Sequence, residues 1–366
     1  MSRRIILLTV LLIFFGTTTP FSQERSPLGL PPVPVPEENP QSLEKIALGK
    51  KLFEDKRFSA DGTVSCANCH DPKKAFTDGL PVAEGIKKLK GTRNSPTVIN
   101  AAYYTSQFWD GRRPTLEEQA KDPFLNPVEH GLSGHEIIID VIRADSEYPG
   151  QFRKIFGVQP PEITIDHVAK AIASFERSII SGDSAFDRYM YGRHKDALSE
   201  SAKRGLELYN GKARCQECHA IGPNYALFTD NKFHNLGVGF KKIQPRLREI
   251  VKEVRMAQQK GRELDESILT KTEISELGRF VVTGKLSDIG AFKTPTLRNI
   301  AVTGPYMHDG SLTTLQEVME LYNKGGEKNP FLGSVRVLNL TDDEIKDVIE
   351  FMNSLTSPEF HGPEKK

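Results

Sequence analysis

Cysteine is scarce in this chain. The 366 residues include only four cysteines. All four lie in two copies of one short pattern, CANCH (Cys66, Cys69, His70) and CQECH (Cys215, Cys218, His219). A fold stabilised by disulfides between distant segments would need cysteines beyond these two patterns, so the sequence does not indicate that class of protein.

An excess of charge of one sign is also lacking. Lys and Arg number 49 against 48 Asp and Glu, which gives a formal net charge of +1. Proteins that bind nucleic acid or anionic membranes usually carry a basic excess. We therefore expect no nucleic-acid partner. A hydrophobic content of 38% over 366 residues is enough for two ordinary cores.

Long apolar runs are absent except at the start of the chain. Residues 5–15 are apolar, follow two arginines and precede small polar residues, which is typical of a cleaved secretory signal over residues 1–22. The run is short for a bilayer span, so we expect a periplasmic protein without stable membrane insertion; an uncleaved anchor is the alternative. The prolines of residues 23–41 favour an extended linker between this signal and the folded body.

The two CxxCH patterns predict two covalently bound haem c groups. Cysteines three apart on a helical turn point the same way and can form thioethers to the haem vinyl groups. The adjoining histidine can then bind the iron. Disulfides or a zinc site are the alternatives, but zinc would need its ligands in one place. Neither alternative explains a histidine directly after both pairs.

Each pattern follows an amphipathic helix and a short loop. Apolar residues recur at helical spacing before the first pattern, at Leu43, Ile46, Ala47 and Phe53, and before the second, at Leu198, Ala202, Leu206 and Tyr209. A third helix starts at a capping box of Thr341 and Glu344. Strand-like alternation is scarce. We predict a mainly α fold of two cytochrome c-like helical domains, each with one covalently bound haem. The predicted bounds are 42–183 and 195–357 for the domains, 184–194 for a connector and 358–366 for a tail.

The segment TTLQEVMELYNKGG (313–326) predicts a further helix, begun by a threonine cap and ended by two glycines. One face carries Leu315, Val318, Met319 and Tyr322. Methionine and tyrosine can both ligate haem iron. From the residues alone, this is either an ordinary core helix or one that binds a haem from one side.

Three longer segments resemble the bacterial di-haem cytochrome c peroxidases and their MauG branch. They are KKLFEDKRFSADGTVSCANCHDPKKAFTDGLP, NSPTVINAAYYTSQFWDGRRPTLEEQAKDPFLNPVEH and GAFKTPTLRNIAVTGPYMHDGSLTTLQEVMELYNKGG. The resemblance covers nearly all of the chain after the proline-rich segment. Residues 243–275 fall outside it and are typical of a charged helical insertion.

The resemblance implies that the first haem is the one that reacts with peroxide. In the peroxidases a loop histidine often blocks this haem in the resting state. Ile86 stands at the matching position here, and isoleucine cannot ligate iron. An open first haem is therefore implied in the fully ferric state, with His130 and His135 as the nearest alternative ligands.

Four further residues match the family's catalytic positions. Glu129 matches the distal glutamate, which moves a proton as the O–O bond of peroxide breaks. Gln119 matches its companion glutamine and Pro123 a residue that crowds the pocket. Trp109, the only tryptophan, matches the aromatic group that carries electrons between the haems. Without the resemblance, Glu129 would be taken as a solvated loop residue and Trp109 as a packing residue.

The resemblance also implies further metal ligands. In the peroxidases a methionine, fourteen residues after the histidine of the HDG motif, is the second ligand of haem 2. Counting from His308 leads to Tyr322, as in the MauG branch, with Met319 or Met307 as alternatives. A calcium ion is implied between the haems. Its ligands would come from Asn94, Thr303 and Pro305.

The resemblance implies an exported peroxidase that reduces hydrogen peroxide to water at haem 1 and stores the second oxidising equivalent on haem 2 through Trp109. Its electron donor would be a small c-type cytochrome or a cupredoxin, and a homodimer is implied because family members are often dimers. A MauG-like oxidase of a partner protein is one alternative, although the chain lacks a second tryptophan for that route. A non-enzymatic electron carrier is the other, against which Ile86 and Tyr322 argue.

Overall fold

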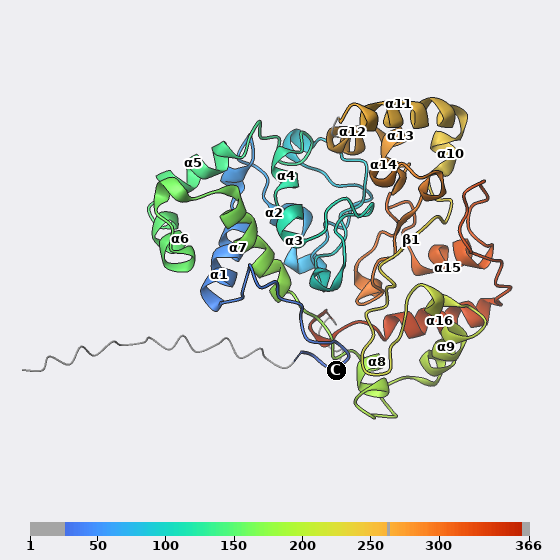
Figure 1. The fold of residues 1–366 in the computed structure, drawn as a ribbon. Helices are drawn as coiled ribbons and strands as arrows, with labels where there is room; N and C mark the ends of the chain where they lie inside the picture. The colour runs from blue at the N-terminus through green and yellow to red at the C-terminus, as the bar shows by residue number, and fades with distance from the viewer. Residues whose placement is uncertain (1–25, 262–263, 361–366) are drawn as a thin grey trace, which may run out of the picture.

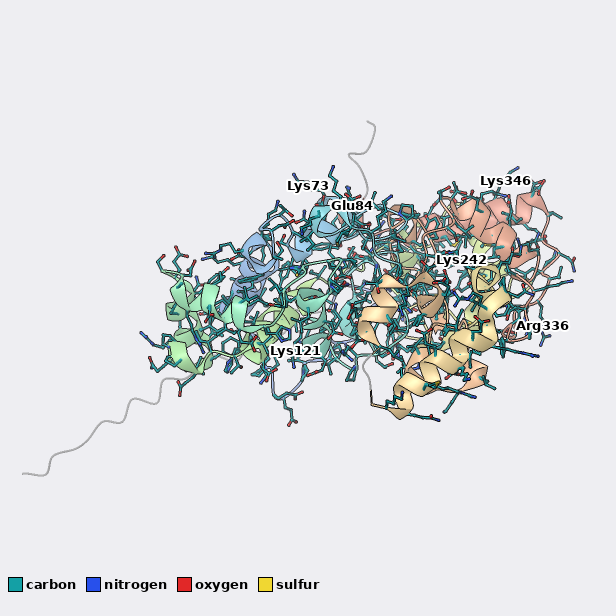
Figure 2. All side chains as sticks on the ribbon, turned by 90° about the horizontal axis from the view of Figure 1, so that it is seen from above. Lys73, Glu84, Lys121, Lys242, Arg336 and Lys346 are labelled. Atoms are coloured by element: carbon teal, nitrogen blue, oxygen red, sulfur yellow. The ribbon has the colours of Figure 1, made fainter. Side chains whose placement is uncertain are left out.

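The computed structural model describes residues 26–261 and 264–360. Two mainly helical domains lie side by side, and a third group of helices lies over the second domain and reaches the first (Figure 1). Charged side chains are spread along the whole molecule, as Lys73, Lys121 and Lys346 illustrate (Figure 2). In the described part of the chain no helix is both long and apolar enough to cross a bilayer. The predicted signal peptide lies outside the described residues.

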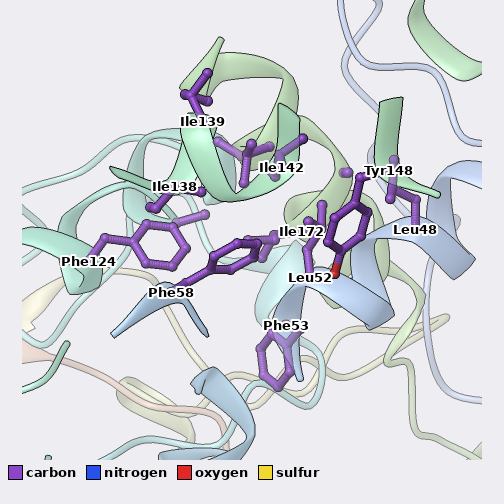
Figure 3. Packing of buried hydrophobic residues seen from close by; sticks show 14 of the residues in the cluster. Leu48, Leu52, Phe53, Phe58, Phe124, Ile138, Ile139, Ile142, Tyr148 and Ile172 are labelled. Carbon is purple, nitrogen blue, oxygen red and sulfur yellow. The ribbon is translucent and has the colours of Figure 1, made fainter. Parts of the chain in front are cut away.

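The first domain is built on a pair of long helices. These are α1 (Leu43–Phe53) and α7 (Ile165–Ser178), with α5 (Glu136–Ala144) and α6 (Tyr148–Phe156) beside them. Three short helices complete it, α2 (Cys66–Cys69), α3 (Leu116–Gln119) and α4 (Asp122–Leu125). Fully buried aromatic and aliphatic side chains fill the space between them, among them Phe58, Phe124, Ile138, Ile142 and Tyr148 (Figure 3). This core supports the loops of the first CxxCH pattern.

The second domain repeats the plan with its own pair of helices. Its elements are α8 (Ala185–Met190), α9 (Glu200–Asn210), α15 (Leu315–Asn323) and α16 (Asp342–Asn353). The capping box predicted at Thr341 and Glu344 starts α16. Phe186 of α8 packs on Phe228 and Phe351. The predicted connector 184–194 therefore contributes to the core of the second domain.

Strands are a minor part of the described residues. β1 (Phe233–His234) pairs antiparallel with β2 (Phe292–Lys293), and Phe233 lies opposite Lys293. The mainly α prediction is confirmed.

The third group of helices contains the predicted charged insertion. It comprises α10 (Phe240–Ile243), α11 (Leu247–Gln259), α12 (Asp265–Thr270), α13 (Thr272–Ser275) and α14 (Phe280–Thr283). Ile250, Val254 and Phe280 are buried in a separate hydrophobic cluster of this group. The insertion is helical, as predicted, and its long helix α11 turns one apolar face inward.

The predicted apolar face of α1 is partly wrong. Leu43 is 69% exposed and Ala47 is exposed as well, whereas Leu48 and Leu52 are almost fully buried. The reason is the contact with α7, which lies over Gly49. A Cβ at Gly49 would lie only 1.9 Å from the carbonyl oxygen of Ala171. The helices meet at this glycine, so the residues beside it form the buried face.

In the second domain the two long helices also meet at a glycine. A Cβ at Gly205 of α9 would lie 1.9 Å from the carbonyl oxygen of Asp347 in α16. Four residues after each glycine comes an aromatic ring, Phe53 or Tyr209, which packs edge-on against a phenylalanine of the partner helix. The two domains are therefore structural repeats over a longer stretch than the CxxCH patterns alone.

The proline-rich segment runs along the folded body over its described part. Tyr103 of the first domain donates a hydrogen bond from its hydroxyl to the Pro31 carbonyl (2.9 Å). In the second domain the Ala226 amide (3.1 Å) and the Arg298 guanidinium (2.6 Å) donate to the Gly29 carbonyl. Residues 26–41 of the predicted linker are thus attached to both domains.

Candidate haem sites

The two histidines that follow the cysteine pairs are oriented in the same way. His70 Nδ1 lies 3.3 Å from the Phe76 carbonyl oxygen, and His219 Nδ1 lies 2.9 Å from that of Phe228. A carbonyl oxygen can only accept, so Nδ1 carries the ring proton and Nε2 is left for a metal. Burial lowers the pKa of both imidazoles, which favours the neutral, iron-binding form.

A cavity of about 230 Å³ lies beside the second CxxCH pattern. Cys215, Cys218 and His219 line it, and Tyr322 of α15 lines it as well. Most of the remaining wall is apolar and includes Leu236, Val238, Ile300, Leu315, Val318 and Met352. None of the four cysteines, all in the described part of the chain, forms a disulfide. An apolar cavity with two thiols and a histidine suits a covalently bound haem.

Tyr322 and Met319 lie one turn apart on α15, and both line the cavity. Met319 is only 3% exposed and packs in the core against α16. Tyr322 is half-buried, and its hydroxyl makes no hydrogen bond to any residue that the structure describes. Burial, with Cys215 and Cys218 nearby, raises the pKa of Tyr322 well above its ordinary value. A phenol without a protein partner that lines this cavity fits a metal ligand. Met307 also lines the cavity.

Trp109 lies at the junction of the two domains. Its indole nitrogen donates to the Asn94 carbonyl (2.9 Å), and its own carbonyl accepts a hydrogen bond from the Lys293 amide of β2 (2.8 Å). Trp109 lines the same cavity as Tyr322. The tryptophan thus connects a loop of the first domain with the cavity of the second.

The three residues predicted to bind calcium line this cavity too. Asn94 comes from the first domain, and Thr303 and Pro305 come from the second. The Asn94 amide nitrogen donates to the Leu80 carbonyl (2.9 Å), so its amide oxygen remains for a cation. The structure brings these residues together although they are far apart in the chain.

His308 is a cavity residue that the sequence analysis used only for counting. Its ring stacks on Phe292 with centroids 3.5 Å apart, and its Nε2 lies 2.7 Å from a Glu276 carboxylate oxygen. Glu276, His308 and Asp309 lie close enough together to hold a metal ion. The Lys242 ammonium, however, lies 2.8 Å from both carboxylates. This cluster therefore already contains a balancing cation.

The repeat could have identified His308 from the sequence. The motifs FWDG and MHDG both form turns with a positive φ at the first residue and at the glycine. Trp109 and His308 are equivalent in these turns.

Lys293 is a second residue that the sequence analysis did not identify. Its ammonium donates to the Ser106 carbonyl (2.7 Å), and burial lowers the pKa of Lys293 to about 7.

Glu129 lies in the loop after α4, close to the first CxxCH pattern. Burial raises the pKa of Glu129 to about 7, although Arg112 acts in the opposite direction. Burial raises the pKa of the Cys66 and Cys69 thiols, and the charge of the Glu129 carboxylate adds to this effect. Ile86 is 5% exposed, and its amide donates to the Glu129 carbonyl (2.9 Å). The residue at the position of the blocking histidine is thus packed directly against the Glu129 loop.

The two histidines considered as alternative ligands both bond to the polypeptide. His130 Nδ1 lies 2.8 Å from the Phe58 carbonyl oxygen, and its ring packs edge-on against Phe124. His135 Nε2 lies 3.0 Å from the Lys121 carbonyl oxygen. Both rings are therefore held in place by the backbone of the first domain.

Gln119 and Pro123 are placed by the internal repeat. Gln119 is the last residue of α3, and Pro123 lies in α4, which follows it. The helices α3 and α15 both start at a threonine cap followed by a buried leucine. Counting from these caps makes Gln119 equivalent to Val318 and Pro123 equivalent to Tyr322, and the latter two line the haem 2 cavity. Proline has no N–H to continue the helix, which here divides into α3 and α4.

Comparison with known proteins agrees with this geometry. The sequence profile of the family described as di-haem cytochrome c peroxidase matches residues 43–195. The cytochrome-c peroxidase IdrP1 of Pseudomonas sp. (strain SCT) is 37% identical over 367 residues, which cover 97% of this chain and 92% of that protein. The chain belongs to the di-haem cytochrome c peroxidase family.

Other members of the peroxidase family are similarly related. The methylamine utilization protein MauG of Methylorubrum extorquens is 36% identical over 324 residues, covering 88% of this chain and 81% of that protein. The crystal structure of a MauG-like protein associated with microbial copper homeostasis has a TM-score of 0.73 at 32% identity, covering 92% and 95% of the two chains. This chain is therefore a haem peroxidase-type oxidoreductase with haem c as its cofactor, and the non-enzymatic carrier is set aside.

Proposed function

We propose that the protein is an exported di-haem peroxidase that reduces hydrogen peroxide to water at an open haem 1. Cys66, Cys69 and His70 would hold haem 1. Cys215, Cys218, His219 and Tyr322 would hold haem 2. The proposal rests chiefly on Glu129, a half-buried residue whose pKa is raised to about 7 and which lies against a loop with isoleucine at the blocking position.

Glu129 has the properties of an acid–base group. Because its pKa lies near neutrality, the carboxylate can take a proton from the near oxygen of peroxide and return it to the far oxygen, which leaves as water. Ile86 cannot ligate iron, and it packs against the Glu129 loop at the position of the blocking histidine. These features support access of peroxide to haem 1, and we propose that Gln119 and Pro123 line its distal side.

Trp109 is proposed to carry an electron between the two sites, because it lines the haem 2 cavity and bonds to both domains. Bound haem supplies the redox chemistry, with the two irons sharing the two oxidising equivalents of peroxide. An anionic phenolate from Tyr322 would favour the higher oxidation states of its iron. A calcium ion held by Asn94, Thr303 and Pro305 would connect the domains beside Trp109.

The partners follow from the family. Members are typically periplasmic and take electrons from cytochrome-type donors. We propose a small c-type cytochrome or a cupredoxin as donor, export to the periplasm, and a homodimer. Oxidation of a partner protein is a second candidate function, favoured by Tyr322 at the haem 2 cavity and by the 36% identity to MauG.

The test is to mix the fully ferric holoprotein with one equivalent of hydrogen peroxide in a stopped-flow spectrometer. A fast spectral change without reductant is expected, with a rate that rises as the pH increases through about 7, because the Glu129 carboxylate is the active form. Glu129→Gln should slow the reaction by roughly 10² to 10⁴. The exposed Glu136→Gln of α5 is the control.

Two outcomes contradict the proposal. A reaction that starts only after one-electron reduction would mean that a residue blocks haem 1. A full rate in Glu129→Gln would remove the acid–base role from this residue.

A further inference from the structure

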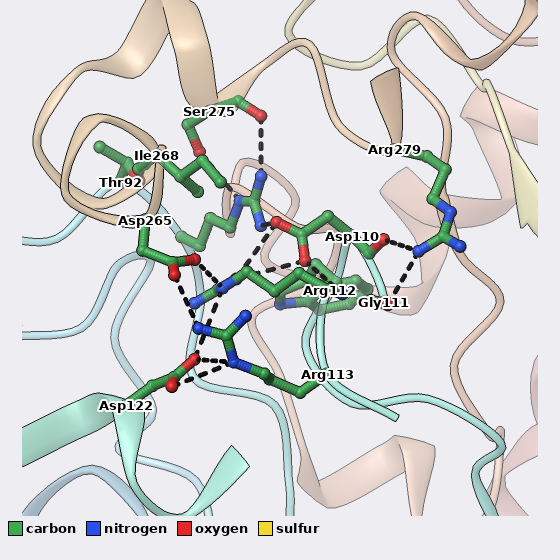
Figure 4. A network of polar contacts seen from close by, with 12 residues as sticks. Thr92, Asp110, Gly111, Arg112, Arg113, Asp122, Asp265, Ile268, Ser275 and Arg279 are labelled. Atoms are coloured by element: carbon green, nitrogen blue, oxygen red, sulfur yellow. Dashed lines mark hydrogen bonds and ion pairs between the residues drawn. The ribbon is translucent and has the colours of Figure 1, made fainter. Parts of the chain in front are cut away.

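The charged insertion is bonded directly to the first domain. Asp265, the first residue of α12, lies 3.1 Å from Arg112 Nε and 2.7 Å from Arg113 Nη2 (Figure 4). Both arginines belong to the loop that follows Trp109. The residues 243–275, which the family resemblance left unexplained, thus have a defined attachment point.

A second attachment lies next to the loop that contains Ile86. The Thr92 hydroxyl donates to the Ile268 carbonyl of α12 (2.8 Å). The Arg93 guanidinium donates to the Ser275 hydroxyl (2.9 Å) and carbonyl (3.0 Å) at the end of α13 (Figure 4). The insertion therefore holds two loops of the haem 1 domain from outside.

Arg112 is the residue on which these contacts converge. Its side chain is 6% exposed, and its guanidinium lies 3.5 Å from the centre of the Phe108 ring. Besides Asp265, its acidic neighbours are Asp110 at 3.1 Å and Asp122 at 4.0 Å. All three acidic residues are shared, Asp110 with Arg93 (2.6 Å), and Asp122 (2.8 Å) and Asp265 (2.7 Å) with Arg113. Asp265 is the acidic partner of Arg112 that comes from the insertion.

We propose that Asp265 is a positioning residue for the peroxide reaction. It fixes the Arg112 guanidinium over Phe108 and partly neutralises its positive charge, and so limits how strongly Arg112 stabilises the Glu129 carboxylate. The inference rests on the proposed role of Glu129. The two groups are connected through α4: Asp122, 4.0 Å from Arg112, is its first residue, and the Glu129 amide donates to the carbonyl of Asn126 at its end (3.1 Å). Burial raises the pKa of Glu129, Arg112 lowers it and Asp122 raises it.

The direction of the effect follows from the charges around the two groups. Arg112 faces Asp110, Asp122 and Asp265, with Arg93 and Arg113 beside them, and Glu129 responds to Arg112 and Asp122. Without the Asp265 charge, Arg112 is less neutralised and stabilises the Glu129 carboxylate more strongly. The pH midpoint of the peroxide reaction should then move down by roughly half a unit to one unit.

The experiment compares Asp265→Asn with Glu266→Gln in the ferric holoprotein. Glu266 is the next residue of α12, is exposed and has no ion pair among the described residues. The Glu266→Gln variant therefore removes the same charge without changing a contact of Arg112. The pH midpoint should fall in Asp265→Asn only, and Asp265→Glu should restore it. Hydrogen exchange of residues 86–93 and 108–113, which does not depend on activity, should increase in Asp265→Asn. Asp265→Ser gives the same test if the asparagine variant does not fold.

Three results would overturn the inference: an unchanged midpoint, an equal shift in Glu266→Gln, or a rate lowered equally at every pH. Failure of the proposed function has a different signature. In that case the wild-type ferric protein does not react, or Glu129→Gln reacts at the full rate, whatever Asp265→Asn does to hydrogen exchange.

Discussion

Tyr322 and Pro123 stand at equivalent positions in the two repeats, and this is one of the differences between the two proposed haem sites. Tyrosine offers an oxygen to the haem 2 cavity, where its hydroxyl has no partner among the described residues. Proline offers no ligand, which is consistent with the proposal that haem 1 is open to peroxide. On this proposal, the same fold would hold one closed and one open haem.

Replacement of Tyr322 by Phe tests this assignment. We expect a changed absorption and spin-resonance spectrum of haem 2. Its reduction potential should rise by a substantial part of the roughly 0.8 V that axial ligands span, because an anionic ligand is lost. Met319→Leu and Tyr306→Phe are controls. Both residues line the haem 2 cavity, but Met319 also packs in the core, and the Tyr306 hydroxyl donates to the Ile300 carbonyl (3.0 Å). An altered spectrum in Met319→Leu with none in Tyr322→Phe would transfer the ligand role to methionine.

Paired helices form the framework of each domain at the scale of elements. The pairs α1–α7 and α9–α16 each meet at a glycine, where a side chain would collide with a backbone carbonyl. Backbone atoms cannot move aside as a flexible side chain can. The close approach fixes each helix pair beneath its CxxCH loop.

Gly49→Ala should therefore destabilise the holoprotein by at least about 1–3 kcal/mol, the usual cost of overpacking. Gly150→Ala is the matched control, because a Cβ there would have no atom within 4 Å and the residue lies in α6. This control should gain about 0.5–1 kcal/mol from helix propensity. Denaturant unfolding of both variants measures the difference. Equal stability of the two variants would show that α1 and α7 can separate without cost.

At the scale of the whole molecule, the junction of the domains is the central feature. Trp109 and Asn94 from the first domain meet Thr303 and Pro305 from the second at one cavity. Residues 26–41 also bond to both domains. These contacts hold the two domains together, as the proposed electron transfer between the two haems would require.

Removal of calcium tests the proposed role of this junction. A chelator should weaken the spectral response of haem 2 to peroxide, and added Ca²⁺ should restore it better than Mg²⁺, which prefers a smaller and more regular site. Asn94→Ala should behave like the chelated protein. Absence of calcium from purified holoprotein by metal analysis, with a full response to peroxide, would refute the site.

Some features were predictable because they depend on neighbours in the chain. The CxxCH patterns, the capping boxes of α15 and α16 and the helical insertion all follow from local spacing. The buried face of α1 was not predictable in the same way. Leu43 fits an amphipathic pattern but is 69% exposed, because the contact with α7 at Gly49 decides which face is buried.

By itself, the sequence determined the covalent attachment of two haems and a mainly helical chain, since both need only residues a few positions apart. The tertiary structure decided which distant residues share a site. It brought Asn94, Trp109 and Tyr322 to one cavity and attached Asp265 to Arg112. It also gave Glu129 its raised pKa, because desolvation depends on what packs around a carboxyl and not on the residues beside it in the chain.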